Sequence, residues 1–303
     1  MKIKLAIEGR YKLETFKSDS SGRELPGSRR TVAPWFKNLI TDAGLERMGT
    51  TPDWMQYCRV GSGSTPPTVT DTTLASLVAS TSTSVSNVSG AQSSAPYFGW
   101  SRKTFRFAEG VAAGNLSEVG VGWFTGNSLF SRALILDPGG NPTTISVGSD
   151  ESLEVTYEIR IFVPATDNTG VVNISGVDYS WTARAANATN STYWSASTNG
   201  AFVNQTGAIA YTGTIGPITG SPSGTGSGLS LSRGSYSSGS KKIAMTITAS
   251  LTQGNVVGGI KSIGTNGGTG FLGSYQLEFD PVIPKTNTQV FSLTYEVAWD
   301  RQP

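Results

Sequence analysis

Alternation of apolar and polar residues is the feature that most restricts what this sequence can fold into. Leu153, Val155, Tyr157, Ile159 and Ile161 are separated by Glu, Thr, Glu and Arg, and the run from Phe291 to Trp299 has the same period. Because successive side chains of a strand point to opposite faces, a period of two is typical of half-buried antiparallel strands. The sequence therefore predicts an all-β protein.

The same order of landmarks occurs twice along the chain. The strand words VTYEI and LTYEV are each preceded by a Gly-Asn turn and then by an Asp-Pro pair. Asn115 and Tyr157 are 42 residues apart, and Asn255 and Tyr295 are 40 residues apart. The nearly equal spacing favours an internal duplication. We therefore expect two tandem, similar antiparallel β-sandwich or β-barrel domains.

The break in the strand pattern at PATDNTG places the expected boundary after Ala165. The first domain is then 1–165, with one short helix at about 34–48, where Pro34 suits a first turn and Gly49 a stop. A shorter helical turn is expected in DTTLASLVA, with Asp71 as its N-cap. The second domain is 166–303. Ser/Thr/Gly-rich insertions at about 79–96 and 185–240 are expected to be exposed loops or irregular strands.

Composition argues against several partner classes. Only 15% of the residues are charged, against ~25% in a usual soluble domain, and the net charge is +2. No basic stripe for nucleic acid is present, no run of eighteen apolar residues predicts membrane insertion, and no export signal is indicated. The one basic cluster, Arg29 and Arg30 with Arg23 and Lys37 nearby, fits an acidic protein surface or an ordinary solvated loop.

The residue types give little support for catalysis. Histidine is absent and Cys58 is the only cysteine, so the sequence predicts no Ser-His or Cys-His catalysis, no metal site and no cofactor. A pair of carboxylates could still hydrolyse a glycan, with candidates at Glu109, Glu118, Asp178 and Asp280. Those residues lie at predicted strand ends or turns, which explains them without chemistry. We predict a protein that is not an enzyme.

Aromatic residues are the remaining candidates for ligand binding. Tyr193 and Trp194 lie in the polar insertion, with Tyr211 and Tyr236 farther along. Exposed rings flanked by hydroxyl groups can stack on a sugar, so these four residues are possible glycan or receptor contacts. The alternative is that Tyr193 and Trp194 fill a local core beneath the long loop.

The first half of the chain resembles proteins encoded among the tail genes of tailed bacteriophages, of the tail-fibre, tail-tip or baseplate type. The resemblance covers about 34–162 and rests on GSGSTPP followed by TDTTL, then NLSEVG, then LFSRA. It implies a non-enzymatic structural protein of the virion, made in the host cytoplasm, that contacts other virion proteins. A host cell-surface glycan is a further candidate partner. The alternatives are a capsid decoration protein and a carbohydrate-binding adhesin or receptor-binding protein.

Tandem duplication combined with this resemblance suggests an assembly. Three chains that each carry two similar domains can form a ring of six quasi-equivalent positions. A homotrimer is therefore the favoured oligomer.

Overall fold

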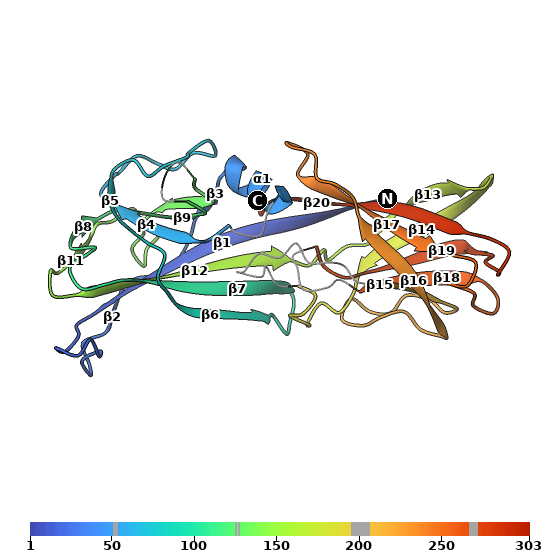
Figure 1. The fold of residues 1–303 in the computed structure, drawn as a ribbon, viewed down its shortest axis with the longest axis horizontal. Helices are drawn as coiled ribbons and strands as arrows, with labels where there is room; N and C mark the ends of the chain where they lie inside the picture. Colours follow the sequence, from blue (N-terminus) through green and yellow to red (C-terminus); the bar gives the residue numbers. More distant parts are fainter. Residues whose placement is uncertain (51–53, 125, 127, 195–206, 267–271) are drawn as a thin grey trace. The chain divides into compact units, whose positions relative to one another are not determined.

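Strands provide almost all of the regular structure, which confirms the all-β class. The computed structural model describes residues 1–50, 54–124, 126, 128–194, 207–266 and 272–303, and within them it contains one helix (Figure 1). The contacts divide the chain into two compact units. Unit 1 comprises Met1–Ile7, Ser89–Trp100 and Arg160–Pro303, and unit 2 comprises Glu8–Val88 and Ser101–Ile159.

Two domains in strict tandem are not confirmed, because the N-terminal residues belong to the unit that also holds the C-terminus. Strand β1 (Lys2–Phe16) begins in unit 1, where it pairs in parallel with β20 (Phe291–Arg301). The register runs from Lys2 opposite Glu296 to Ile7 opposite Arg301. The division at Ile159 and Arg160 lies close to the expected boundary, but unit 1 also includes segments from before it.

Unit 2 is built around a five-stranded sheet in the order β3-β10-β9-β4-β5, with a separate β8-β11 pair. The other strands that contribute to this unit neighbour one another in the order β1-β12-β7-β6, and β2 pairs with β1. The bounds are β2 (Arg30–Lys37), β3 (Leu39–Ile40), β4 (Tyr57–Gly61), β5 (Leu77–Thr81), β6 (Ser84–Ala91), β7 (Phe98–Phe107), β8 (Gly114–Leu116), β9 (Glu118–Gly122), β10 (Ser131–Leu134), β11 (Ile145–Val147) and β12 (Ser152–Phe162).

The expected helix at 34–48 is wrong in its bounds. Helix α1 spans Asp42–Thr50, and β2 and β3 occupy most of 30–40. The hydroxyl of Thr41 accepts a hydrogen bond from the Gly44 N–H at 2.8 Å, so the N-cap is Thr41. Phe36 and Ile40 are buried from strands, because β2 pairs antiparallel with β1 and β3 pairs antiparallel with β10.

The helical turn expected after Asp71 is also wrong. The Asp71 carboxylate accepts hydrogen bonds from the Thr68 N–H and hydroxyl, at 2.9 and 2.7 Å, and thus closes a turn that precedes it. Strand β5 begins at Leu77. The insertion at 79–96 therefore contains part of β5 and all of β6, and the insertion at 185–240 contains β15 and β16.

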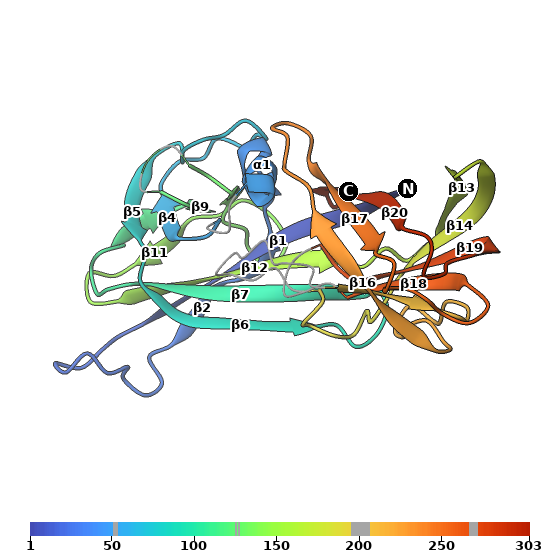
Figure 2. The same ribbon diagram turned by 45° about the vertical axis from the view of Figure 1, so that its right-hand side comes forward.

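Unit 1 is an antiparallel arrangement in the order β13-β14-β19-β18-β15-β16-β17-β20, closed by the parallel pairing of β20 with the start of β1 (Figures 1 and 2). The first half of β16 pairs with β15 and the second half with β17. The bounds are β13 (Asn168–Ile174), β14 (Val177–Ala185), β15 (Gly207–Tyr211), β16 (Gly226–Arg233), β17 (Lys242–Ala249), β18 (Ile260–Asn266) and β19 (Tyr275–Ile283).

The core follows the alternation of the sequence. The apolar faces of β12 and β20, including Tyr157 and Tyr295, are buried. On the opposite face the two strands differ, since Glu154 and Glu158 of β12 are buried beneath other charged side chains, whereas Ser292 and Thr294 of β20 are exposed.

Four strands of each unit pair in the same order. In unit 2, β4 pairs with β9, β9 with β10 and β10 with β3, all antiparallel. In unit 1, β15 pairs with β18, β18 with β19 and β19 with β14, again antiparallel. Strand β12 neighbours β7 as β20 neighbours β17. Thr156 and Thr294 hold the same place in the words VTYEI and LTYEV. The Thr156 hydroxyl lies 3.0 Å from that of Thr104 in β7, and the Thr294 hydroxyl lies 3.0 Å from that of Thr246 in β17.

Candidate functional site: an ion cluster that pins an exposed loop

The segment Ser62–Ser76, which joins β4 to β5, is the most unusual loop of unit 2, and we call it the pinned loop. It contains the sequence word TDTTL and all of GSGSTPP except the first glycine, Gly61, which ends β4. Most of its residues are exposed, eight of the fifteen are Ser or Thr, and Asp71 is its one charged residue. Leu74 is the exception among its apolar residues, because its side chain is only 6% exposed and belongs to the buried core. A long loop with this composition would ordinarily be mobile, so the contacts that order it matter.

Glu118 holds both ends of the pinned loop. It is the first residue of β9, and none of its surface is exposed. One carboxylate oxygen accepts hydrogen bonds from the main-chain N–H groups of Gly63, at 3.1 Å, and Ser76, at 2.7 Å. The other oxygen accepts one from the Ala75 N–H at 3.0 Å. A single carboxylate therefore satisfies three main-chain donors.

Arg132 neutralises this buried carboxylate and reaches farther into the loop. It lies in β10 and is 3% exposed. Its guanidinium donates to Glu118 with N–O distances of 2.9 and 2.8 Å, to an Asp71 oxygen at 2.6 Å and to the Thr65 carbonyl at 2.9 Å. In the pairing of β10 with β9, Leu134 lies opposite Glu118. Arg132 is two residues before Leu134 in β10, so its side chain lies on the same face of the sheet as that of Glu118.

We call Glu118, Arg132 and Asp71 the ion cluster. Partial burial raises the pKa of Asp71, but the hydrogen bonds from Thr68 and the charge of Arg132 outweigh this effect and leave the pKa lowered. Asp71 is therefore ionised at neutral pH, and the guanidinium lies between two carboxylates. Removing either member of a buried ion pair leaves the other charge buried without compensation, which strongly destabilises the fold.

Glycines are required where the pinned loop leaves β4. A Cβ atom at Gly63 would collide with the Glu118 carboxylate, and one at Gly61 would collide with both that carboxylate and the Ser76 carbonyl. Close packing against Glu118 and Ser76 therefore explains why glycine stands at positions 61 and 63 of the word GSGSTPP.

The arrangement orders a surface loop, and its two carboxylates and its guanidinium are paired with one another or with groups of the loop. All the Glu118 oxygens are engaged, so this member of the carboxylate candidates is not available for acid–base work. Glu109 is exposed, Asp178 accepts a hydrogen bond from Asn173, and Asp280 lies 3.6 Å from Lys261. Within the described residues, no group of three or more His, Cys, Asp or Glu side chains could hold a metal ion.

Trp194 does not form the exposed platform considered for it, and this is a correction. Its ring is fully buried, and its indole N–H donates to the Ala186 carbonyl at 2.8 Å. The ring packs edge-on against Tyr275 at 5.7 Å and lies against Gly273. Trp194 is thus a core residue of unit 1.

The other aromatic candidates are half-buried and have different neighbours. Tyr193 donates its main-chain N–H to Asn190, and Tyr211 lies in β15 against Gly226. Tyr236 stacks on Trp299 at 5.7 Å. Burial raises the pKa of Tyr211. These contacts do not bring the four rings together as one platform.

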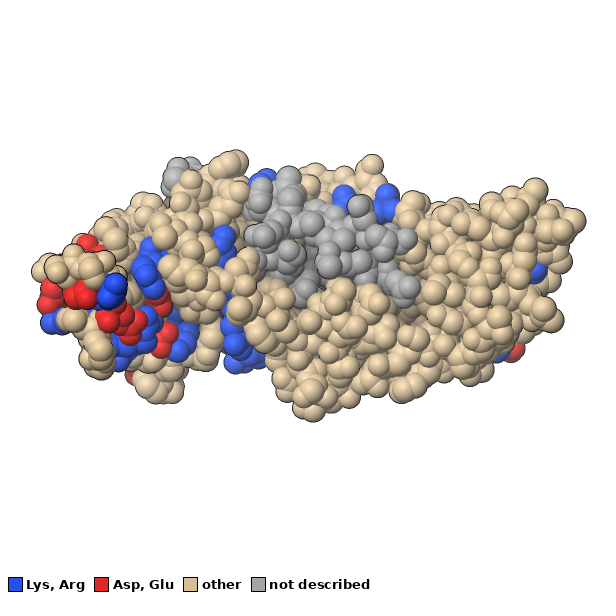
Figure 3. Space-filling model, turned by 60° about the horizontal axis from the view of Figure 1, so that its bottom comes forward, with Lys and Arg blue, Asp and Glu red and all other residues tan. Residues whose placement is uncertain are grey.

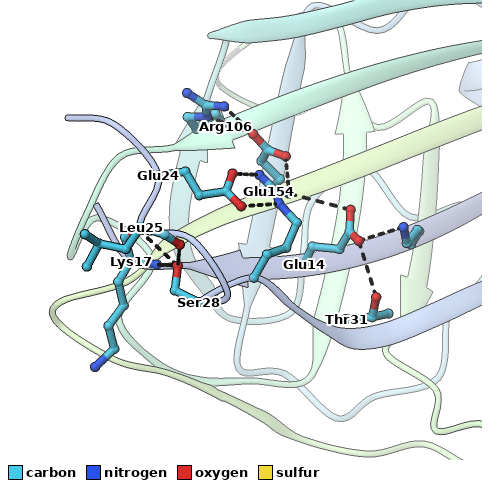
Figure 4. A network of polar contacts seen from close by, with 10 residues as sticks. Glu14, Lys17, Glu24, Leu25, Ser28, Thr31, Arg106 and Glu154 are labelled. Carbon is cyan, nitrogen blue, oxygen red and sulfur yellow. Dashed lines mark hydrogen bonds and ion pairs between the residues drawn. The ribbon is translucent and has the colours of Figure 1, made fainter. Parts of the chain in front are cut away.

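The basic cluster at Arg29 and Arg30 is not a free positive patch. Arg29 donates to Glu24 at 2.9 and 2.6 Å and to Glu154 at 2.7 Å, and Arg106 donates to the other oxygen of Glu154 at 2.9 and 2.6 Å (Figure 4). Arg30 pairs with Glu151 at 2.9 Å. Blue and red side chains are correspondingly interleaved where charge gathers in Figure 3. The surface is of mixed sign, so it does not select an acidic partner.

Sequence reasoning missed Arg132 and the role of Glu118. A usable signal was present, because each is a lone charged residue beside an apolar strand, in SEVGVGWF and SRALIL, and the two have opposite signs. Opposite charges in neighbouring apolar strands indicate a buried ion pair.

Comparison of the chain with protein-family models, with curated protein sequences and with solved structures finds no match. Among the described residues, no helix has the length and apolar character needed to cross a membrane.

Proposed function

We propose that this protein is a non-enzymatic structural component of a tailed bacteriophage particle. It acts in the tail, at the baseplate, the tail tip or the fibre attachment, through contacts with other particle proteins. One observation carries the proposal. The words that carry the resemblance, GSGSTPP and TDTTL in the β4–β5 connection, NLSEVG at β9 and LFSRA at β10, come from three parts of the chain and meet at the ion cluster, which fixes the pinned loop.

An exposed loop that is ordered by buried charges suits a contact surface. Burying Glu118 and Arg132 is costly in solvation free energy, and a pair of apolar residues in their place would stabilise unit 2 equally well. The pair instead holds a hydroxyl-rich loop in one conformation before a partner arrives. Such preorganisation lowers the entropy lost on binding. A protein that works through surfaces gains from it directly.

The matching strand connectivity of the two units supports a second part of the proposal, that they are copies of one β module. Three chains then supply six similar modules and can join a six-fold tail to a three-fold fibre. In this arrangement β12 and β20 are scaffold, and the pinned loop faces a neighbouring subunit.

Quantitative mass spectrometry of purified particles tests the proposal. We expect the chain to be present at roughly three to twelve copies per particle, as the symmetry of a tail requires. Hundreds of copies would instead indicate a capsid decoration protein. Absence from particles purified from cells that express the chain would refute virion membership.

A further inference from the structure

A pocket of about 400 Å³ lies in unit 2, beside the pinned loop and at the Leu39 end of β3. In the pairing of β10 with β3, Arg132 lies opposite Leu39, which is the first residue of β3. Ala133 and Leu134 therefore extend past the end of β3, and they line the pocket together with Leu136. A volume of this size lies within the range of ligand pockets in proteins.

Apolar side chains from four segments surround the pocket. Leu134 belongs to β10 and Leu136 follows it, Leu39 comes from β3, Pro67 from the pinned loop and Pro142 from the turn after β10. The three leucines and Pro67 are half-buried, and Pro142 is exposed. Part of this apolar surface is thus in contact with water. Covering it with an apolar group of a partner would remove it from water, which favours binding.

The ion cluster fixes the wall that the pinned loop contributes. Arg132 donates to the Thr65 carbonyl at 2.9 Å, and the Asp71 carboxylate accepts from the Thr68 N–H at 2.9 Å. Thr65 and Thr68 lie on either side of Pro67 in the sequence. The buried charges therefore hold the main chain on both sides of this wall residue.

The turn after β10 is fixed by its own hydrogen bonds. The Asn141 N–H donates to the Asp137 carboxylate at 2.9 Å, and the Gly140 N–H donates to the Asp137 carbonyl at 2.9 Å. Leu136 and Pro142 form an antiparallel bridge across the turn. The carboxylate of Asp137 is thus directed at the main chain of its turn. A pocket whose walls are already ordered loses little entropy when it binds.

Lys37 is the one charged residue among the described residues that line the pocket. Its side chain is 62% exposed, and its Nζ lies 2.8 Å from Glu8, which is 8% exposed and also accepts from Arg10 at 2.8 Å. Two cations therefore share one carboxylate that lies beneath them. The cluster at Arg29 differs, because Glu24 is 37% exposed there. An ammonium has three N–H donors, so Lys37 can keep Glu8 and donate to another acceptor.

We propose that the pocket receives an apolar side chain of a neighbouring protein of the particle, and that an acidic residue next to that side chain pairs with Lys37. Charge complementarity selects the acidic residue. Lys37 and Arg10 repel a basic partner, and a wholly apolar partner would take the ammonium out of water without a new acceptor. The hydroxyl groups of the adjoining pinned loop offer hydrogen bonds to the main chain of the partner, which favours a protein segment over a free lipid.

This inference rests on the proposed function, and it names the kind of partner that the pinned loop meets. It also gives the ion cluster a task, since the buried charges keep Pro67 in place as one wall of the pocket. Peptide binding is measured on the isolated chain, and membership of the virion is measured on particles. Either result can therefore fail while the other stands.

Nuclear magnetic resonance titration of the full chain with three synthetic peptides tests the proposal. The acidic peptide is acetyl-Ser-Glu-Leu-Glu-Ser-amide, the glutamine peptide replaces both glutamates by glutamine, and the serine peptide replaces the leucine by serine. We expect the acidic peptide to shift the amide signals of Leu39, Leu134 and Gly140 at millimolar concentration. The glutamine peptide should bind about two- to fivefold more weakly, as the loss of an exposed ion pair requires, and the serine peptide should leave these signals unchanged.

Two variants assign the charge effect to Lys37. Lys37→Gln should weaken binding of the acidic peptide by about two- to fivefold and should leave the glutamine peptide unaffected. Lys17→Gln is the matched control, because Lys17 is 49% exposed, pairs with Asp150 at 2.7 Å and does not line the pocket. It should leave both peptides unaffected. In about 1 M salt, where the screening length is about 3 Å, the acidic and glutamine peptides should bind equally.

Equal binding of the acidic and glutamine peptides at low salt, an unchanged affinity of Lys37→Gln for the acidic peptide, or signal shifts outside the pocket would each overturn the proposal. Octanoate represents a free amphiphile. If octanoate shifts the same signals and binds more tightly than the acidic peptide, the assignment to a protein segment is wrong. If Lys37→Gln fails to fold, the comparison of the three peptides on the wild-type chain still decides.

Discussion

Replacing Glu118 by glutamine tests the ion cluster, because it removes one charge and keeps the shape. The remaining Oε1 still accepts from Gly63 and Ser76, but an amide NH₂ now faces the Ala75 N–H and the Arg132 guanidinium, which are all donors. Arg132 is left 3% exposed with Asp71 as its only carboxylate partner. Breaking a buried ion pair in this way costs about 3–5 kcal/mol of unfolding free energy.

Urea denaturation measures this loss, and hydrogen exchange locates it. We expect the midpoint to fall and the Ala75 amide to lose its protection. Glu296→Gln is the control, because the Lys242–Glu296 pair is 43% and 35% exposed and should change stability by less than about 1 kcal/mol. If Glu118→Gln costs no more than Glu296→Gln, the cluster does not pin the loop and the reasoning is wrong.

Three further outcomes are expected. Trp194→Ala should lower the unfolding free energy by about 3–5 kcal/mol, because it empties a fully buried site, and unchanged stability in urea would place the ring at the surface. The unfolding free energy should be flat from about pH 5 to 8, since the chain has no histidine, and should fall below about pH 4, where Asp71 and Glu8 protonate. Their pKa values are lowered in the folded state despite burial, so the stability they contribute is complete above the unfolded pKa and lost as the pH falls through the folded pKa; a decline between pH 8 and 5 would contradict this. Cys58 should resist a thiol reagent until the chain unfolds, because it is buried and burial raises the pKa of its thiol; rapid labelling of the native protein would refute its placement.

The alternation of the sequence predicted the strands that carry the core. Tyr157 and Tyr295 lie on buried faces of long strands, as their spacing required. Periodicity reports which face of a strand is buried, and that information is local. The helix bounds failed because the apolar residues before Asp42, such as Phe36, also fit a strand, and the pairing of β2 with β1 decides between the two.

Long-range contacts explain the remaining errors. The pairing of β1 with β20 joins the two ends of the chain, so a boundary drawn along the sequence could not capture it. The pinned loop is ordered by Glu118 and Arg132, which lie 42 to 67 positions farther along the chain than the loop residues they contact. The Ser/Thr-rich composition of the loop alone predicts only an ordinary exposed loop. Trp194 lies in a polar segment outside the strands and still reaches the core, because its ring packs against Tyr275 of β19.

Cryo-electron microscopy of the intact particle tests the central claim most directly. We expect density for three chains in the tail, with six similar β modules around the axis. A particle whose tail contains no density that fits units 1 and 2, or one that carries the chain only on its capsid, would contradict it.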